Sequence, residues 1–241
     1  MFRFKDFSLF HERSTLKIGT DSVLLSAAVP LNNVSQVLDV GCGCGVITFC
    51  IANRLQKSAS QEVTLTGIDI DADSVTEAVQ NSKIFPKTQK EIKFDFQHIS
   101  IQEYAQIAQN RFDLVVSNPP FFSHSLKPEE ENRLKSKHRD EVLPFESLIQ
   151  ATEKILSPDG RFYVILPFSE LADFEINAKY FFHICEKMLI QSVPHKLPNR
   201  VILGMSKLPV NYKESSLTIR DINNSFTEEY KQLTHNYYLD F

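Results

Sequence analysis

A stiff tetrapeptide, Asn118-Pro119-Pro120-Phe121, directly follows an apolar run that predicts a strand buried on both faces. Each proline fixes its own φ and pushes the preceding residue into extended geometry. The side-chain oxygen of Asn118 and the carbonyl of Pro119 would then be two fixed hydrogen-bond acceptors, with Phe121 as a flat aromatic face. Two acceptors and a ring suit a planar group that carries an NH2. The alternative is an ordinary proline turn with a core phenylalanine.

A glycine-rich turn, Asp39-Val40-Gly41-Cys42-Gly43-Cys44-Gly45, separates a predicted strand from a predicted helix. Three of the seven glycines of the chain fall within it, and glycine lets a backbone bend tightly and approach a ligand. The spacing G-x-G-x-G departs from the G-x-G-x-x-G of dinucleotide sites. An acidic residue before the first glycine suits S-adenosylmethionine (SAM), which carries an ammonium and a sulfonium and no phosphates. The alternative is a tight structural turn.

A second acidic motif, Gly67-Ile68-Asp69-Ile70-Asp71, ends the next predicted strand. A carboxylate at this point of a βαβ unit can accept hydrogen bonds from both hydroxyls of a ribose, and Asp69 is our candidate. Asp71 is better explained as the N-cap of the following helix. Paired with the glycine turn in one βαβ unit, Asp69 predicts a site for a nucleoside cofactor.

Composition narrows the class of protein. The chain has 241 residues, 42% hydrophobic and 23% charged, with a formal net charge of −4, so it is neither disordered nor a highly basic protein that coats polyanions. No apolar run approaches the ~20 residues of a membrane span, and we expect no signal peptide. The cysteines Cys42, Cys44, Cys50 and Cys185 lack a second ligand cluster, so we expect no metal and a reducing, cytoplasmic location.

The elements that must position these motifs alternate between strand and helix. Strands are predicted over 36–40, 63–70, 92–98, 112–117, 161–166, 183–192, 201–207 and 217–220, the fifth after a turn over 157–160. Helices are predicted over 23–31 with Thr20 or Asp21 as N-cap, and over 46–56, 72–83, 101–108, 145–156 and 227–233. This order predicts an α/β fold with a mostly parallel sheet, helices on both faces and antiparallel pairing at one edge. We expect a single domain over 1–241, with 1–30 as an N-terminal cap segment and 211–241 as the C-terminal edge strand and helix.

One long polar connection, over 119–143, interrupts the alternation and carries several basic side chains. Since the whole chain is acidic, RNA binding would have to come from local clusters of this kind, and each contact with a phosphate would make affinity salt-dependent. The cluster is formed by Lys135, Lys137 and Arg139, with Arg3, Lys5, Arg13, Lys196 and Arg200 elsewhere in the chain. The alternative for each of them is a solvated surface charge.

Taken together, the segments DVGCGCG, GIDID and NPPF resemble class I SAM-dependent methyltransferases that act on planar nitrogens. Three further segments are similar to the bacterial tRNA1(Val) (adenine(37)-N6)-methyltransferase family: 17–25, Lys137-His138-Arg139 and Arg200-Val201-Ile202-Leu203. The resemblance spans roughly residues 15–210 and so covers most of the chain.

The resemblance implies a Rossmann-like class I methyltransferase fold with seven strands, and transfer of a methyl group from SAM to N6 of a tRNA adenine, leaving S-adenosylhomocysteine. It implies no metal, a tRNA partner and no evident obligate protein partner. The implied catalytic residues are Asn118, Pro119, Pro120 and Phe121. The implied cofactor-binding residues are Thr20, Asp39, Gly41, Cys42, Gly43, Gly45, Asp69, Ile70, Ser100, Ile101 and Asn118. The implied RNA-binding residues are Lys135, Lys137, His138, Arg139 and Arg200. The third strand of the family usually ends in an acidic residue near the cofactor adenine, and here Ser100-Ile101 stand in its place.

Other substrates and one other class of protein stay open at this stage. The same tetrapeptide would serve methylation of a glutamine amide in a protein, or of another base in RNA or DNA. Methylation of cytosine C5 needs a cysteine nucleophile in the loop, and residues 117–143 contain none. A SAM- or RNA-binding module without turnover is the non-enzymatic alternative.

Overall fold

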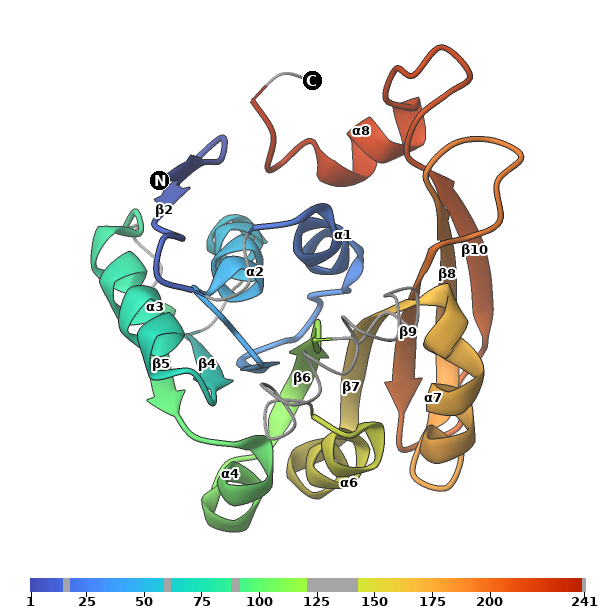
Figure 1. Cartoon of the computed structure of the whole chain (residues 1–241). Coiled ribbons are helices and arrows are strands. Elements are labelled where there is room, and N and C mark those ends of the chain that lie inside the picture. Colours follow the sequence, from blue (N-terminus) through green and yellow to red (C-terminus); the bar gives the residue numbers. More distant parts are fainter. Residues whose placement is uncertain (15–17, 59–61, 88–91, 121–142, 240–241) are drawn as a thin grey trace, which may run out of the picture.

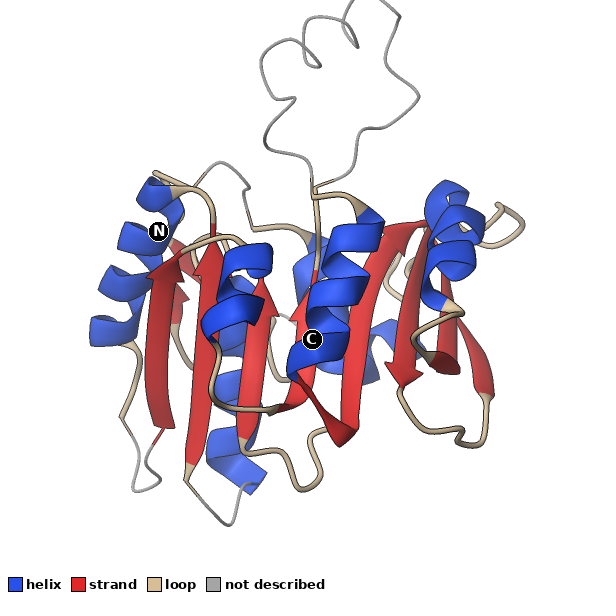
Figure 2. Ribbon diagram, turned by 90° about the horizontal axis from the view of Figure 1, so that it is seen from below, coloured by secondary structure: helices blue, strands red, loops and turns tan. Residues whose placement is uncertain are grey.

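The computed structural model describes residues 1–14, 18–58, 62–87, 92–120 and 143–239. Within them, eight strands form one twisted sheet with helices on both faces (Figures 1 and 2). The strands are β3 (Gln36–Val40), β4 (Val63–Asp69), β5 (Ile92–His98), β6 (Phe112–Ser117), β7 (Leu156–Pro167), β8 (His183–Gln191), β9 (Arg200–Ser206) and β10 (Lys213–Thr218). A short hairpin of β1 (Phe2–Arg3) and β2 (Ser8–Leu9) stands apart from the sheet.

The strand order across the sheet is β10-β8-β9-β7-β6-β3-β4-β5. β9 is antiparallel to both of its neighbours, and the other pairs are parallel. The carboxyl ends of the parallel strands therefore lie along one edge of the sheet, where β9 begins. Ligands of open α/β sheets bind at such an edge.

Two apolar cores, one on each face, explain why the central strands read as continuous hydrophobic runs. Neighbouring residues of one strand face opposite cores: Val37 of β3 and Leu114 of β6 face one core, whereas Leu38 and Val115 face the other. The first core is covered by α1 (Thr20–Ala28), α2 (Val46–Ser58) and α8 (Glu228–Thr234), and the second by α4 (Ile101–Ile107), α6 (Phe145–Ile155) and α7 (Leu171–Ala178). The turn η1 (Phe168–Glu170) precedes α7, and α3 (Ala72–Ile84) packs on β4 and β5.

The structure has the eight strands predicted from the residues, one more than the seven that the resemblance implied, and the antiparallel strand is not at the edge. β9 returns from β8 and fits between β7 and β8, so β8 keeps a free edge that β10 occupies in parallel. β10 covers Lys213–Thr218, earlier in the chain than the predicted strand over 217–220. The first residues of β10 are exposed and polar, so the hydrophobicity pattern of the sequence does not reveal this strand.

Two predicted element ends were also wrong. α1 begins at Thr20 with Gly19 as N-cap, so neither Thr20 nor Asp21 is the N-cap residue, and the glycine that takes this position has no side chain to cap the helix. β7 begins at Leu156, which pairs with Phe112 of β6, so the predicted turn over 157–160 lies inside the strand. The predicted cap of α3 was right: the Asp71 side chain accepts a hydrogen bond from the N–H of Asp73.

Candidate active site

The glycine turn joins β3 to α2 at the carboxyl edge of the sheet. Gly41, Gly43 and Gly45 all have positive φ angles, of 71°, 55° and 87°. The N–H groups of Gly41 and Cys42 both donate to the carbonyl of Ile68 at the end of β4. A Cβ at Gly41 would meet nothing within 4 Å, so the turn presents bare backbone to open space. This is the close approach to a ligand for which glycine is suited.

An aromatic wall supports the turn from behind. A Cβ at Gly45 would lie 2.5 Å from Cε2 of Phe49, and one at Gly67 would lie 2.6 Å from the ring of Phe96. The two rings lie 5.7 Å apart, centroid to centroid. Both glycines are thus required for packing, and Gly45 for its positive φ as well.

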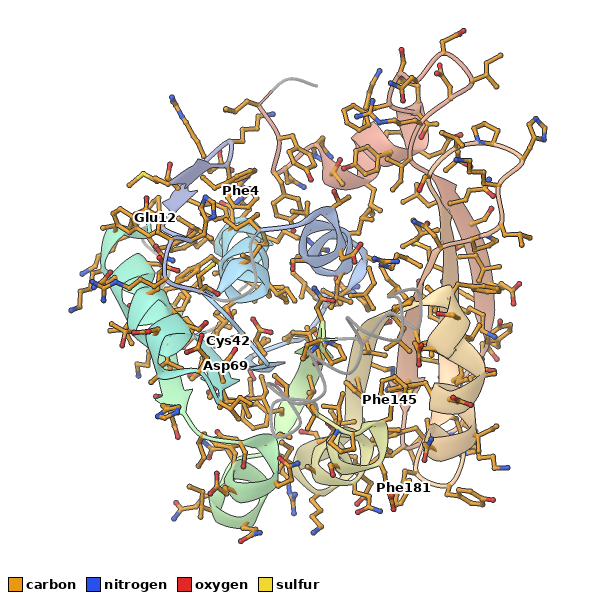
Figure 3. All side chains as sticks on the ribbon, in the orientation of Figure 1. Phe4, Glu12, Cys42, Asp69, Phe145 and Phe181 are labelled. Carbon is orange, nitrogen blue, oxygen red and sulfur yellow. The ribbon has the colours of Figure 1, made fainter. Side chains whose placement is uncertain are left out.

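Asp69 lies directly against the glycine turn. Its Oδ2 accepts a hydrogen bond of 2.8 Å from the N–H of Gly43, and its Oδ1 accepts one of 2.9 Å from the N–H of Asp71. Figure 3 shows Asp69 beside Cys42, at the ends of neighbouring strands. Burial raises the pKa of the Asp69 carboxyl. Each oxygen keeps a second lone pair for a ligand hydroxyl, and the adjacent Ile70 offers an apolar surface that is 48% exposed.

Asp39 lies beneath the glycine turn. It is not among the residues that line the cavity on the other side of this turn, between the turn, the start of α1 and the end of β6. Its side chain is fully buried, and Oδ2 accepts hydrogen bonds from the N–H and the hydroxyl of Thr48 in the first turn of α2. Oδ1 has no hydrogen-bond partner among the described residues. Burial raises the pKa of Asp39 to about 7. In the structure Asp39 thus anchors the start of α2, and its predicted contact with a ligand ammonium stays a prediction.

A cavity of about 320 Å³ lies over the turn, between it, the start of α1 and the end of β6. Asn118, the first residue after β6, lines this cavity together with Thr20, Ser22 and Gly41. The amide nitrogen of Asn118 donates a hydrogen bond of 3.2 Å to the hydroxyl of Ser22. The fold therefore brings the two motifs that the sequence singled out, the glycine turn and Asn118, to the lining of one cavity, at the ends of the neighbouring strands β3 and β6.

The remaining predicted residues are placed as follows. Ser100 caps α4: its hydroxyl donates to Oε2 of Glu103 and accepts from the N–H of Glu103, and Ile101 behind it is 3% exposed. Pro119 is buried and Pro120 is exposed. Arg200 begins β9, at the same edge of the sheet as the cavity. The following predicted residues lie outside the described residues: Phe121, Lys135, Lys137, His138 and Arg139.

Two residues that sequence reasoning missed hold the N-terminal segment beside the glycine turn. Glu77 of α3 is 1% exposed, and its carboxylate accepts hydrogen bonds from three consecutive backbone N–H groups, those of Glu12, Arg13 and Ser14. Asn81, one turn further on, bonds the N–H and the carbonyl of Phe10 as well as the carbonyl of Cys44. A lone acidic or amide residue in a helix carries no sequence signal for such a role.

Other chemistries receive no support from the described part of the chain. Its residues contain no group of three or more His, Cys, Asp or Glu side chains placed to hold a metal ion. The thiols of Cys42, Cys44 and Cys50 are buried, and burial raises the pKa of each above its ordinary value, so none is a ready thiolate nucleophile. Among the described helices, none is long and apolar enough to cross a membrane.

The fold and the site together define a class I methyltransferase. A family model described as a methyltransferase domain matches residues 31–232. Among solved structures, one from Agrobacterium tumefaciens, described as a predicted O-methyltransferase, superposes with a TM-score of 0.68. It is 16% identical, and the match covers 92% of this chain and 100% of that one. At this identity the likeness concerns the fold alone.

Relatives that match over their full length show to which family of methyltransferases the chain belongs. The chain is 33% identical over 241 residues to the tRNA1(Val) (adenine(37)-N6)-methyltransferase of Trichodesmium erythraeum, covering 100% of this chain and 98% of the relative. It is 33% identical to the protein of the same name from Flavobacterium johnsoniae, with 99% of each chain covered. The protein belongs to the tRNA1(Val) (adenine(37)-N6)-methyltransferase family.

Proposed function

We propose that this protein transfers a methyl group from SAM to the exocyclic N6 of an adenine in tRNA, namely adenine 37, beside the anticodon of tRNA1(Val). The observation that carries the proposal is the position of Asn118, which lines the same cavity as the glycine turn. The name of the family supplies the nucleotide and the tRNA.

The residues around the turn fit SAM on the chain's own geometry. The open space over Gly41 would take the amino-acid end of the cofactor, and the spare lone pairs of Asp69 would accept the two ribose hydroxyls. Ile70 would pack against the cofactor adenine. When bound, SAM supplies a methyl group on a positively charged sulfur.

Asn118 and Pro119 would act on the acceptor nitrogen. The lone pair of adenine N6 is delocalised into the ring, which makes the nitrogen a poor nucleophile. Hydrogen bonds from its two N–H groups to Asn118 Oδ1 and to the Pro119 carbonyl would localise that lone pair and stabilise the positive charge that develops on nitrogen. The fixed position of the acceptors at the end of β6 would align the nitrogen with the methyl group.

Ser22 would set the orientation of the Asn118 amide. With Nδ2 donating to the Ser22 hydroxyl, Oδ1 is the end of the amide left for the substrate. The target base has to leave its stack to reach this cavity, and a loop adenine costs less to extrude than a paired one.

Labelled SAM offered to the purified protein with total tRNA, and separately with a protein fraction, tests the proposal. Label in tRNA that is recovered as N6-methyladenosine at one position supports it. Label in the protein fraction as N-methylglutamine, or in a different base, contradicts it. Nucleoside mass spectrometry of tRNA from cells that lack the gene, compared with the parent strain, then identifies the position in vivo.

A further inference from the structure

A second and larger cavity, of about 710 Å³, adjoins the catalytic cavity. Gly19, Thr20 and Asp21, at the start of α1, line both of them. The other walls of the larger cavity come from β1, from the start of β9 and from the segment 219–239 after β10. A volume of this size is typical of a ligand site, and nothing in the proposed transfer reaction occupies it.

The charges in this second cavity favour an anionic ligand. Three arginines line it, Arg3, Arg200 and Arg220, and one carboxylate, Asp21, which is already paired with Arg200 over 2.8 Å. Within the described part of the chain, the Arg3 side chain is exposed and makes no ion pair. The guanidinium of Arg220 lies over the ring of Phe226, 4.1 Å from its centroid.

Aromatic rings line the same walls. Phe226 and Tyr230 stack at 5.0 Å with an interplanar angle of 18°, and Tyr238 lies 6.3 Å beyond Tyr230 at 28°. Phe226 and Tyr238 are partly exposed. Arginines interleaved with partly exposed aromatic rings are the combination by which proteins bind single-stranded nucleic acid, through the phosphate and the base respectively.

The larger cavity lies next to the place where we propose that methyl transfer occurs. A base in the catalytic cavity and a group in the larger cavity would be separated only by the start of α1, because the two share Gly19, Thr20 and Asp21 as a wall. Gly19, the N-cap of α1, has no side chain to cap the first turn, so backbone N–H groups there add to the donors available at this wall. Residues that follow β8 and β10 or begin β9 line the larger cavity, and residues that follow β3 and β6 line the smaller one, so both lie at the carboxyl edge of the sheet.

We propose that the larger cavity is a subsite for the nucleotide that adjoins the target adenine in the RNA strand, with arginines on its phosphate and aromatic side chains against its base. The inference rests on the proposed function, because it takes the neighbouring cavity to hold an adenine. It adds a reason for loop substrates: a strand that places two successive nucleotides in two pockets must be unpaired there.

Binding of a synthetic RNA hairpin, with the target adenine in its loop, to the full-length protein tests the inference. Fluorescence anisotropy over a salt series is measured for the wild type, Arg3→Gln and Arg220→Gln. Lys213→Gln is the matched control, since Lys213 is exposed at the opposite end of the strand that leads to Arg220. Each subsite variant should weaken affinity several-fold and lower the salt slope by about 0.7, whereas the control should change neither. Arg3→Gln breaks no described contact, so its result does not depend on refolding of the 219–239 segment.

A cross-linking experiment tests whether the nucleotide next to the target adenine lies in the larger cavity. The same hairpin with 4-thiouridine next to the target adenine is irradiated with the protein, and the linked peptides are sequenced. Links to residues that line the larger cavity, in the segment 219–239, β1 or the start of β9, support the inference, and links confined to residues outside that lining overturn it. Unchanged affinity and salt slope in both arginine variants also overturn it. If the wild type transfers no methyl group to any RNA, the proposed function fails; if it does and the variants match the control, the subsite alone fails.

Discussion

Arg200 at the start of β9 donates a hydrogen bond from Nε to Oδ2 of Asp21 in the first turn of α1, over 2.8 Å and across 179 positions of sequence. Both side chains are about one third exposed. Asp21 lies on the wall that the two cavities share, and Arg200 lies on the larger cavity. The pair therefore links α1, which carries Ser22, to the sheet edge where we expect the RNA.

The pair predicts opposite effects of two substitutions on RNA binding. Asp21→Asn frees Arg200 for a phosphate, so affinity for the tRNA should rise or the salt slope should steepen, whereas Arg200→Gln should weaken binding. Filter binding over a salt series measures both effects. Because the pair is partly exposed, its loss should cost about 1 kcal/mol of stability or less. Equal weakening by both variants would mean that the pair is structural only.

Substitution of Asn118 separates cofactor binding from transfer. Asn118→Ala removes one of the two proposed acceptors for the amino group but no predicted contact with the cofactor ribose. Methyl transfer should fall by about 10²–10³-fold, as when one group that stabilises transition-state charge is removed elsewhere. Calorimetry should show SAM affinity within a few-fold of wild type. Asn223→Ala, in an exposed turn, is the control. Retained transfer would refute the role of Asn118.

Substitution of Asp69 should act on the cofactor instead. Asp69→Ala would remove the two proposed hydrogen bonds to ribose, and it removes the anchor of the Gly43 N–H. Hydrogen bonds to a charged group contribute about 1.5–3 kcal/mol each, so SAM affinity should fall by at least about tenfold. Equilibrium dialysis with labelled SAM measures the loss. The control, Asp173→Asn on the exposed face of α7, should bind as wild type does. Unchanged affinity in Asp69→Ala would exclude the ribose contact.

The buried carboxyl of Asp39 predicts a pH dependence of stability. Its pKa is raised from 3.8 to about 7 by burial, so the folded state holds a proton that the unfolded state has lost between these pH values. The free energy of unfolding should therefore decrease as pH rises from about 4 to about 7, with a slope of at most ~1.4 kcal/mol per pH unit from this group. The loss should be complete above the folded pKa. Urea unfolding of wild type and Asp39→Asn at several pH values isolates the contribution of this carboxyl, since the asparagine of the variant does not titrate. Parallel curves for the two proteins would contradict the assignment.

Glu77 predicts a link between stability and the site. Glu77→Ala leaves three backbone N–H groups of residues 12–14 without their acceptor, which should cost at least about 2 kcal/mol. The segment that lies beside Gly43 would loosen as well, so SAM affinity should fall along with stability. Glu146→Ala, exposed in the first turn of α6, should change stability by about 0.5 kcal/mol or less. Chemical denaturation and calorimetry distinguish the two variants, and equal stability would contradict the anchoring role.

The local motifs were predictable because each is contiguous and lies at the end of a strand or directly after it. The glycine turn, Asp69 and Asn118 each combine a chemical group with the backbone that presents it, and hydrophobic runs place the strands before them. Parallel strands bring their carboxyl ends to one edge, so the meeting of the three motifs followed from the fold class. The helix cap at Asp71 was predictable for the same reason, since its donor is two residues away.

What only the tertiary structure decided depends on partners that are far apart in the chain. The Ser22–Asn118 hydrogen bond spans 96 positions and the Asp21–Arg200 pair 179, and Glu77 meets backbone groups more than 60 positions away. Strand periodicity shows which residues face a core but does not show which strand pairs with which, so the insertion of β9 between β7 and β8 was not predictable. The sequence by itself determined the chemistry of single motifs, because their groups are covalently close. The second cavity, and the orientation of Asn118, exist only once packing brings separate segments together.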